Sequence, residues 1–336
     1  MRVNQIVVVG ASSGGVEALR VIAASLPEHL AAPVCVVLHT SPESPAILSD
    51  LLDRVSPLRA VTARNHERLA PGTIYVAPPD SHLLVEPGTL RLTKGPRENR
   101  FRPAIDPLFR SAAQVYGPAV IGVVLTGNLD DGTAGLWAVK HLGGIAVVQD
   151  PHDAMFPGMP RSALEHVDSD YVVRLTEIGP LIADLTSKPI DERGVAPREV
   201  PDHLEVEMKI AREENALDAG LERVTTPSTF ACPECHGVLL QMKEGGRIRF
   251  RCHTGHAYSV ESLLAAVNEA IEHSLWNAVR AIEEGDLLLT RMASHFKSSA
   301  NGDEARIAEM VQKTRAQAEA VRKIVLEHDP LTVSKA

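Results

Sequence analysis

The sequence predicts an α/β fold, with a doubly wound and mostly parallel sheet in its first half, for three reasons. Short, continuous apolar runs recur, beginning with Ile6-Val7-Val8-Val9 and Val34-Cys35-Val36-Val37-Leu38, and such runs are typical of strands covered on both faces. Segments with the apolar spacing of a helix separate these runs, as in Val16 to Leu26. The resulting alternation of strand and helix indicates βαβ crossovers, which connect parallel strands.

The later elements of this half follow the same alternation. Residues 81–93 alternate apolar and polar side chains around Pro87-Gly88, which predicts a hairpin. The remaining apolar runs predict strands over residues 72–77, 119–125 and 145–148, and the periodic segments predict helices over residues 106–116 and 134–142. Residues 1–186 are therefore interpreted as one domain.

From residue 187 the chain changes character. Prolines and charges become more frequent over residues 187–228, which we interpret as a linker, and the periodic stretch His203 to Arg223 predicts an amphipathic helix within it. Residues 229–258 are expected to form a small zinc-ribbon-like module. Residues 259–330 predict a helical hairpin, with helices over Val260 to Phe296 and Glu304 to His328.

The composition limits the classes of function. The chain has 336 residues, of which 44% are hydrophobic and 23% are charged, as in ordinary soluble proteins. The net charge of −9 argues against nucleic acid as a partner. No apolar run approaches the roughly 20 residues of a membrane helix, and the first residues lack the pattern of a signal peptide. These observations predict a cytoplasmic protein without membrane insertion.

The loop Gly10-Ala11-Ser12-Ser13-Gly14-Gly15 joins the first predicted strand to the first helix. Ligands of open α/β sheets bind beyond the carboxyl ends of the strands, and a helix amino terminus there stabilises developing negative charge. A dinucleotide loop is the first alternative, but Ser12 replaces its middle glycine and no ribose-binding acid follows the second strand. The second alternative is that Ser12 caps the helix, which the loop alone favours over catalysis.

Two further strand ends bring polar groups to the same edge of the predicted sheet. His39 directly follows the second strand, and Asp130 and Asp131 follow the strand that ends near Leu125. One of the two aspartates is expected to cap the helix beginning near Thr133. A serine hydroxyl needs a base to accept its proton, and an imidazole base needs an anionic partner. The order Ser, His, Asp differs from that of the α/β-hydrolases, which excludes that superfamily.

At these residues the sequence resembles the catalytic domain of chemotaxis protein-glutamate methylesterases, the CheB family. The resemblance runs from about residue 4 to residue 185. Besides the serine loop and the histidine that closes the second strand, it includes the segments Ala77 to His82, Arg102 to Phe109, Leu125-Thr126-Gly127 followed by Asp131-Gly132, and Phe156 to Arg161. So many motifs in one order are far more specific than any one of them.

The resemblance implies that Ser12 is the nucleophile, His39 the general base and Asp131 the residue that orients the base. It places Ser13, Gly14 and Asn128 at the oxyanion or substrate site. The implied reaction hydrolyses glutamate γ-methyl esters on the cytoplasmic domains of methylated chemoreceptors through an acyl-enzyme, releasing methanol and needing no cofactor. Deamidation of receptor glutamines is the companion activity.

Three departures from the family pattern stand out. The regulatory receiver domain that usually precedes this domain is expected to be missing, because the first strand begins close to Met1. The family commonly has Met-Gly-Asn where this chain has Asn128-Leu129-Asp130, and Thr40 replaces a usual methionine after the histidine. A non-enzymatic signalling adaptor that keeps the fold for partner binding is therefore the alternative to an esterase.

The module over residues 229–258 carries a metal-site pattern. Cys232 and Cys235 lie in one predicted turn and Cys252 in another, and His256 fits best as the fourth ligand, with His253 and His236 as alternatives. The module has too few apolar residues to fold without a metal, so a structural zinc is expected. The basic residues Lys243, Arg247, Arg249 and Arg251 are interpreted as a solvated hairpin face. We expect the module and the following helices to contact a regulatory protein partner.

Overall fold

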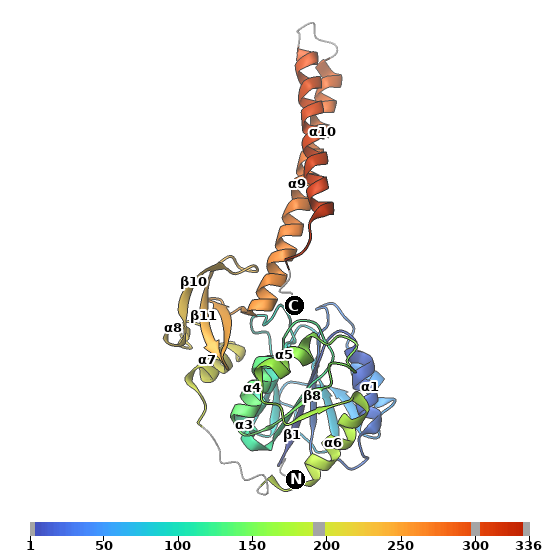
Figure 1. Ribbon diagram of the computed structural model, residues 1–336, viewed down its shortest axis with the longest axis vertical. Helices are drawn as coiled ribbons and strands as arrows, with labels where there is room; N and C mark the ends of the chain where they lie inside the picture. Colours follow the sequence, from blue (N-terminus) through green and yellow to red (C-terminus); the bar gives the residue numbers. More distant parts are fainter. Residues whose placement is uncertain (1–3, 191–198, 297–302, 332–336) are drawn as a thin grey trace. The chain divides into compact units, whose positions relative to one another are not determined.

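The computed structural model describes residues 4–190, 199–296 and 303–331, and it is drawn in Figure 1. The chain divides into two compact units, Met1–Ser262 and Leu263–Ala336. Residues 191–198 of the expected linker and residues 297–302 of the expected helical hairpin lie outside the described residues.

The first unit contains a seven-stranded sheet in which every neighbouring pair of strands is parallel. Its strand order is β3-β4-β2-β1-β7-β8-β9, and β5 and β6 form a separate antiparallel hairpin. The strands are β1 (Ile6–Ala11), β2 (Val34–Leu38), β3 (Arg59–Thr62), β4 (Thr73–Val76), β5 (His82–Glu86), β6 (Thr89–Thr93), β7 (Val120–Val124), β8 (Ile145–Gln149) and β9 (Tyr171–Val173). The helices are α1 (Gly15–Ser25), α2 (Leu48–Asp53), α3 (Ile105–Tyr116), α4 (Thr133–His141), α5 (Gly158–His166) and α6 (Leu175–Ser187).

Both faces of this sheet are covered, as the apolar runs predict. Successive residues of a strand point to opposite faces, so Ile6 and Val8 of β1 belong to one core with side chains of α3, α4 and α5. Val7 and Val9 belong to a second core with side chains of α1, α2 and α6. In Figure 1, α3 and α4 lie on one side of the sheet and α1 and α6 on the other. The predicted doubly wound α/β fold is confirmed.

Two edge strands, β3 and β9, were not predicted from the sequence, and the reason is the same for both. Strand β3 has only four residues and begins with the exposed Arg59, and β9 has only three residues, none of them buried. An edge strand covered on one side need not carry the continuous apolar run that marks β1 and β2. The missed strands therefore lie at the two margins of the sheet.

A second, antiparallel sheet follows in the same unit. It has the order β10-β11-β12-β13 and is called the C-terminal sheet below. Its strands are β10 (Thr226–Ala231), β11 (Val238–Glu244), β12 (Arg247–Cys252) and β13 (Ala257–Ser259), and two helices precede it, α7 (Asp202–Ala211) and α8 (Leu221–Val224). The continuous helix expected from His203 to Arg223 is wrong, because the chain turns at Glu213, whose φ is 74°, and at Gly220, whose φ is 96°.

The C-terminal sheet packs against the domain that carries the parallel sheet. Between them the Asn99 N–H donates to the Ala257 carbonyl over 2.8 Å, and the Ala257 N–H donates to the Arg97 carbonyl over 3.1 Å. The expectation that Arg247, Arg249 and Arg251 form a solvated face is wrong, because their side chains are buried. They face carboxylates that lie far away in sequence, Glu98 and Asp130 among them.

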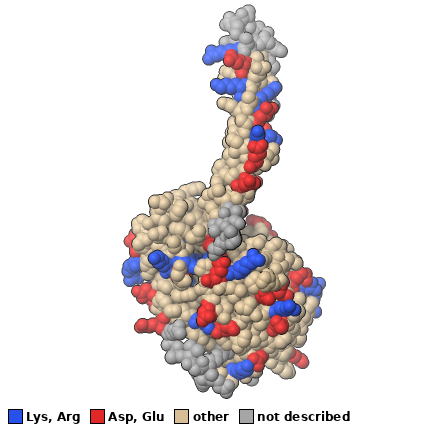
Figure 2. Space-filling view, viewed as in Figure 1, with Lys and Arg blue, Asp and Glu red and all other residues tan. Residues whose placement is uncertain are grey.

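The second unit is helical. It holds most of α9 (Val260–Phe296), whose first residues belong to the first unit, together with α10 (Asp303–Glu327). Ion pairs of Arg315 with Asp286 and of Arg322 with Glu283 show that the two helices run antiparallel. Figure 2 shows acidic and basic side chains interspersed along these helices. Among the described residues, no helix is long and apolar enough to cross a membrane.

Candidate active site

Three loops meet at the carboxyl edge of the parallel sheet. Ser12 directly follows β1, His39 directly follows β2, and Asp131 lies in the loop that follows β7. Strand β1 lies between β2 and β7 in the sheet, so the three loops are neighbours. This is the point where the strand order reverses, and open α/β sheets bind their ligands there.

The structure brings the three predicted side chains into one hydrogen-bonded chain. His39 Nδ1 lies 3.1 Å from Ser12 Oγ, and His39 Nε2 lies 2.7 Å from Asp131 Oδ2. The side chains of His39 and Asp131 are each only 3% exposed. The His39 ring stacks on Phe101, with 3.7 Å between ring centroids and 8° between ring planes. The imidazole is therefore held between a carboxylate and a hydroxyl and is shielded on one face.

Asp131 is surrounded by hydrogen-bond donors. Besides His39, its carboxylate accepts the Ile105 N–H over 2.7 Å, the Asn99 amide over 2.8 Å and the Gly132 N–H over 3.0 Å. Burial by itself raises the pKa of Asp131, but these donors and the nearby imidazole outweigh it and lower the pKa to about 2. The group is thus a carboxylate at neutral pH, as the partner of an imidazole base must be.

A second buried carboxyl, Asp106, lies beside Asp131. Burial, reinforced by the neighbouring Asp131 charge, raises the pKa of Asp106 to about 7. Its Oδ1 accepts the N–H groups of Gly132 over 3.0 Å and of Gly135 over 2.7 Å. Gly135 lies in the first turn of α4, so Asp106 caps this helix from α3. The expectation that Asp130 or Asp131 caps α4 is wrong, because the Asp130 carboxylate pairs with Arg247 and the Gly135 N–H inside the helix donates to Asp106.

The geometry of the serine loop distinguishes between the two roles considered for Ser12, helix capping and catalysis. Helix α1 has Gly14 as its N-cap residue, with a φ of 74° and no side-chain capping hydrogen bond. The Ser12 carbonyl, not its hydroxyl, accepts the Gly15 N–H. The Ser12 hydroxyl faces His39 and is available to a substrate in the cleft. The structure therefore gives no support to the capping interpretation.

The other predicted substrate-site residues lie beside Ser12. The Asn128 amide donates to Ser13 Oγ over 3.1 Å, so these two side chains meet at the loop. Gly127, which precedes Asn128, has no room for a side chain. A Cβ atom there would lie 2.8 Å from Ser12 Cβ and 2.1 Å from Met159 Sδ. The close approach of this backbone to Ser12 requires glycine.

A cleft of about 400 Å³ opens over Ser12 and His39. Its wall includes three arginines, Arg97, Arg100 and Arg102, on the loop that also carries Phe101. Arg97, Asn99, Arg100 and Phe101 are site residues that no sequence pattern indicated. Their segment has no helical or strand periodicity, and the only signal close by was the family-like run that begins at Arg102.

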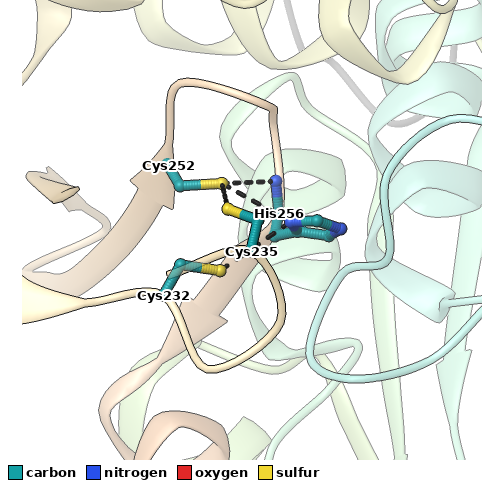
Figure 3. Close-up of side chains that lie close together, drawn as sticks. All are labelled: Cys232, Cys235, Cys252 and His256. Carbon is teal, nitrogen blue, oxygen red and sulfur yellow. Dashed lines mark hydrogen bonds between the residues drawn. The ribbon is translucent and has the colours of Figure 1, made fainter. Parts of the chain in front are cut away.

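The structure also brings the four predicted metal ligands together. The donor atoms of Cys232, Cys235, Cys252 and His256 all lie within 4.8 Å of one another, and Figure 3 shows the three sulfur atoms close together beside His256. His256 Nδ1 faces the sulfur atoms of Cys232 and Cys252, at 3.7 and 3.5 Å. His256 Nε2 lies 3.4 Å from Glu234 Oε2. A carboxylate behind a histidine ligand is the usual second partner at zinc sites.

A hydroxyl, an imidazole and a buried carboxylate in one hydrogen-bonded chain are the arrangement of the serine hydrolases, and here they lie on a doubly wound α/β fold. The sequence model of the CheB methylesterase family matches residues 7–182. The chain therefore belongs to the CheB methylesterase family.

Individual relatives agree with this assignment. A relative in Leptospira interrogans is 39% identical over 188 residues, which are 56% of this chain and 97% of the relative. Protein-glutamate methylesterase/protein-glutamine glutaminase 2 of Caulobacter vibrioides is 38% identical over 182 residues, which are 53% of this chain and 52% of the relative. The crystal structure of the Thermotoga maritima CheB methylesterase catalytic domain matches with 36% identity and a TM-score of 0.52, covering 54% of this chain and 98% of that one.

Proposed function

We propose that this protein is a protein-glutamate methylesterase that hydrolyses glutamyl methyl esters on methylated chemoreceptors, with glutamine deamidation as a companion activity. The observation that carries the proposal is the hydrogen-bonded chain from Ser12 through His39 to Asp131 at the cleft. Membership of the CheB methylesterase family supports the same chemistry. Receptor cytoplasmic domains as substrates would require the enzyme to act in the cytoplasm.

The geometry supports a two-stage acyl transfer. In the first stage His39 accepts the Ser12 hydroxyl proton while Oγ attacks the ester carbonyl, and the ionised Asp131 stabilises the resulting imidazolium. The tetrahedral intermediate then expels the methoxy group, which takes the proton from His39 and leaves as methanol. In the second stage water attacks the acyl-Ser12, His39 again acts as base, and a glutamate carboxylate is released. A glutamine substrate releases ammonia instead of methanol.

The oxyanion is assigned to the start of α1. A helix amino terminus carries N–H groups and a partial positive charge, both of which stabilise a developing negative charge. The serine loop presents Ser12 at this terminus, with the Ser13 hydroxyl and the Asn128 amide beside it. We assign Ser13, Gly14 and Asn128 to the oxyanion and substrate site.

The cleft arginines indicate the character of the substrate surface. Arg97, Arg100 and Arg102 line the cleft, and Arg102 is paired with Asp80 over 2.7 Å, although the chain as a whole has a net charge of −9. A concentration of one sign of charge at a cleft attracts substrates of the opposite sign. We therefore expect the methyl ester to lie in an acidic stretch of the receptor, with carboxylates next to the esterified residue.

We further propose that Cys232, Cys235, Cys252 and His256 hold a structural zinc ion. Three thiolates and one imidazole are a donor set that zinc prefers, and the Glu234 carboxylate behind His256 fits the same role. The ion would join the turn around Cys232 to the turn around Cys252. In this role zinc stabilises the C-terminal sheet. We expect a regulatory protein partner to bind to this sheet.

The experiment that tests the function uses matched peptides. One carries a glutamate γ-methyl ester flanked by glutamates, and the other carries the same ester flanked by glutamines. The proposal predicts hydrolysis of both peptides, with the acidic one favoured in kcat/KM and the preference weakened by 0.5 M salt. Binding of the acidic peptide without any hydrolysis would favour the adaptor instead. Equal kcat/KM for the two peptides would contradict the expectation that the cleft arginines favour an acidic substrate.

A further inference from the structure

One loop of the catalytic domain touches two members of the triad. The Asn99 side-chain amide donates to Asp131 Oδ1 over 2.8 Å and to Asp106 Oδ2 over 3.0 Å. Two residues later, Phe101 stacks on the His39 ring. Asn99 and Arg100 have φ angles of 50° and 77°, a left-handed conformation that asparagine adopts more readily than most residues and that is uncommon for arginine. Residues 97–101 are called the triad loop below.

The C-terminal sheet supplies much of what surrounds this loop. The backbone of Ala257 exchanges hydrogen bonds with Arg97 and Asn99, so β13 and the triad loop are joined by one parallel bridge, between Ala257 and Glu98. The Asn99 side-chain oxygen accepts the Ser259 N–H over 3.2 Å and the Ser262 hydroxyl over 3.3 Å. The orientation of the Asn99 amide is thus set by two serines that follow it by more than 150 positions in the chain.

A second connection reaches the residue next to the catalytic aspartate. The Asp130 carboxylate accepts the Ser259 hydroxyl over 2.7 Å and pairs with Arg247 of β12. Leu129, just before it, has a φ of 61°, a left-handed conformation that favours glycine. This is the stretch where Asn128-Leu129-Asp130 departs from the family pattern of Met-Gly-Asn. Asp130, which stands where the family commonly has asparagine, is thus bound by side chains of the C-terminal sheet.

Buried charges hold the two parts together. Glu98 of the triad loop pairs with Arg110 of α3, with Arg249 over 3.5 Å and with Arg251 over 2.9 Å. Arg249 also lies 3.6 Å from Asp106. All of these side chains are buried. Separating the parts would leave buried charges without partners, which is costly, and such pairs also fix a geometry because few arrangements satisfy them.

We propose that the C-terminal sheet is a positioning element of the esterase, which fixes the triad loop so that Asn99 orients Asp131 and Phe101 supports His39. Asn99, Ser259 and Ser262 are positioning residues, since they act through Asp131 and not on the substrate. Any event that displaces β13 lowers turnover by loosening the aspartate. The proposal rests on the esterase function proposed above.

Full-length variants test the proposal. Asn99→Gly tolerates the positive φ and removes the amide, and the double variant Ser259→Ala/Ser262→Ala removes two hydroxyl groups from the C-terminal sheet. Ser228→Ala is the matched control, because it removes a hydroxyl that hydrogen-bonds within the same sheet, to the Leu239 carbonyl and the Phe230 N–H. Hydrolysis of a glutamyl methyl ester peptide gives kcat and KM. NMR of the downfield proton between His39 and Asp131 reports their hydrogen bond without any substrate.

Misplacing a catalytic group by about 1 Å can cost about 100-fold in rate. We therefore expect kcat to fall about 10- to 100-fold in Asn99→Gly and by a smaller factor in the double variant, with KM unchanged. The downfield proton should shift or broaden in both variants, and Ser228→Ala should match the wild type in all readouts.

Wild-type kcat and an unmoved downfield proton in Asn99→Gly and in the double variant would overturn the proposal. So would equal losses in the Ser228→Ala control, which would indicate general destabilisation. An inactive wild-type protein would instead overturn the esterase function, and the NMR comparison would still decide whether the sheet positions the triad.

Discussion

Arg251 of β12 donates two hydrogen bonds to the Glu207 carboxylate of α7, over 2.7 Å and 2.5 Å, and both side chains are buried. The same guanidinium reaches Glu98 over 2.9 Å. One arginine thus joins the C-terminal sheet, the segment that precedes it and the triad loop. The catalytic domain and the C-terminal sheet share a buried ionic network at this point.

Removing Arg251 should therefore destabilise the protein strongly. Arg251→Ala removes one of the two arginines that pair with both Glu98 and Glu207 and leaves Arg110 as the other. We therefore expect a loss in the free energy of unfolding near the lower end of the about 3–5 kcal/mol that breaking a buried pair typically costs. Urea denaturation measures the change. Arg280→Ala is the control, because Arg280 pairs with Glu284 on an exposed helix surface, where a loss of about 0.5 kcal/mol or less is expected. Equal losses in the two variants would contradict the assigned network.

Asp106 should make stability depend on pH in a predictable direction. Its pKa is raised by burial and by Asp131 to about 7, above the value of about 4 in an unfolded chain. The folded state therefore holds the proton more tightly, and this contribution to stability is full below pH 4 and is lost as the pH rises to 7. Asparagine does not titrate, so the stability of the wild type relative to Asp106→Asn should fall between pH 4 and pH 7.

Urea denaturation of both proteins across this pH range measures that difference. A difference in unfolding free energy that is constant with pH would show that Asp106 does not retain its proton in the folded state. A difference that grows in favour of the wild type as the pH rises would reverse the assignment and mean that the ionised form is the stabilised one.

Gly127 should tolerate no side chain. The Cβ atom of Gly127→Ala would overlap Met159 Sδ and crowd Ser12 Cβ, so we expect a loss of about 1–3 kcal/mol in stability together with a displaced nucleophile and low kcat. Gly285→Ala in α9 is the matched control, because a Cβ there meets no neighbouring atom and alanine stabilises a helix interior by about 1 kcal/mol. Thermal melting and ester hydrolysis of the two variants check both effects. An active Gly127→Ala enzyme would contradict the close approach at Ser12.

The Cys/His cluster should bind one zinc ion per chain. Elemental analysis of protein purified without added metal should give this ratio, and Cys252→Ser should lower it. A chelator should then lower the melting temperature of the wild type, since metal bound to the folded state stabilises it by mass action. Cys35→Ala is the control, because Cys35 is buried in β2, away from the cluster. Full zinc content in Cys252→Ser would exclude it as a ligand.

The triad could be predicted because each member follows an apolar run. Ser12 and His39 come directly after β1 and β2, and parallel strands place their carboxyl ends at one edge of the sheet. Asn99 could not be found in this way. Its segment has no periodicity, and its role depends on Ser259 and Ser262, which only the folded chain brings beside it.

The arginines of β12 show that the burial of a side chain is harder to predict from sequence than its position on a strand. Their spacing of two residues at positions 247, 249 and 251 indicates one face of a strand. Whether that face meets water or protein depends on where the acidic side chains lie. Glu98 and Glu207 are separated from this strand by many positions in the chain, so the sequence alone favoured the ordinary outcome for arginine, which is exposure.

Methanol release from membranes that carry methylated chemoreceptors tests the central claim most directly. The wild type should release methanol, and Ser12→Ala should reduce the rate by about 10⁴-fold or more, because a triad without its nucleophile retains little activity. Ser169→Ala, a serine substitution outside the cleft, should retain the wild-type rate. Release by Ser12→Ala at the wild-type rate would contradict the account.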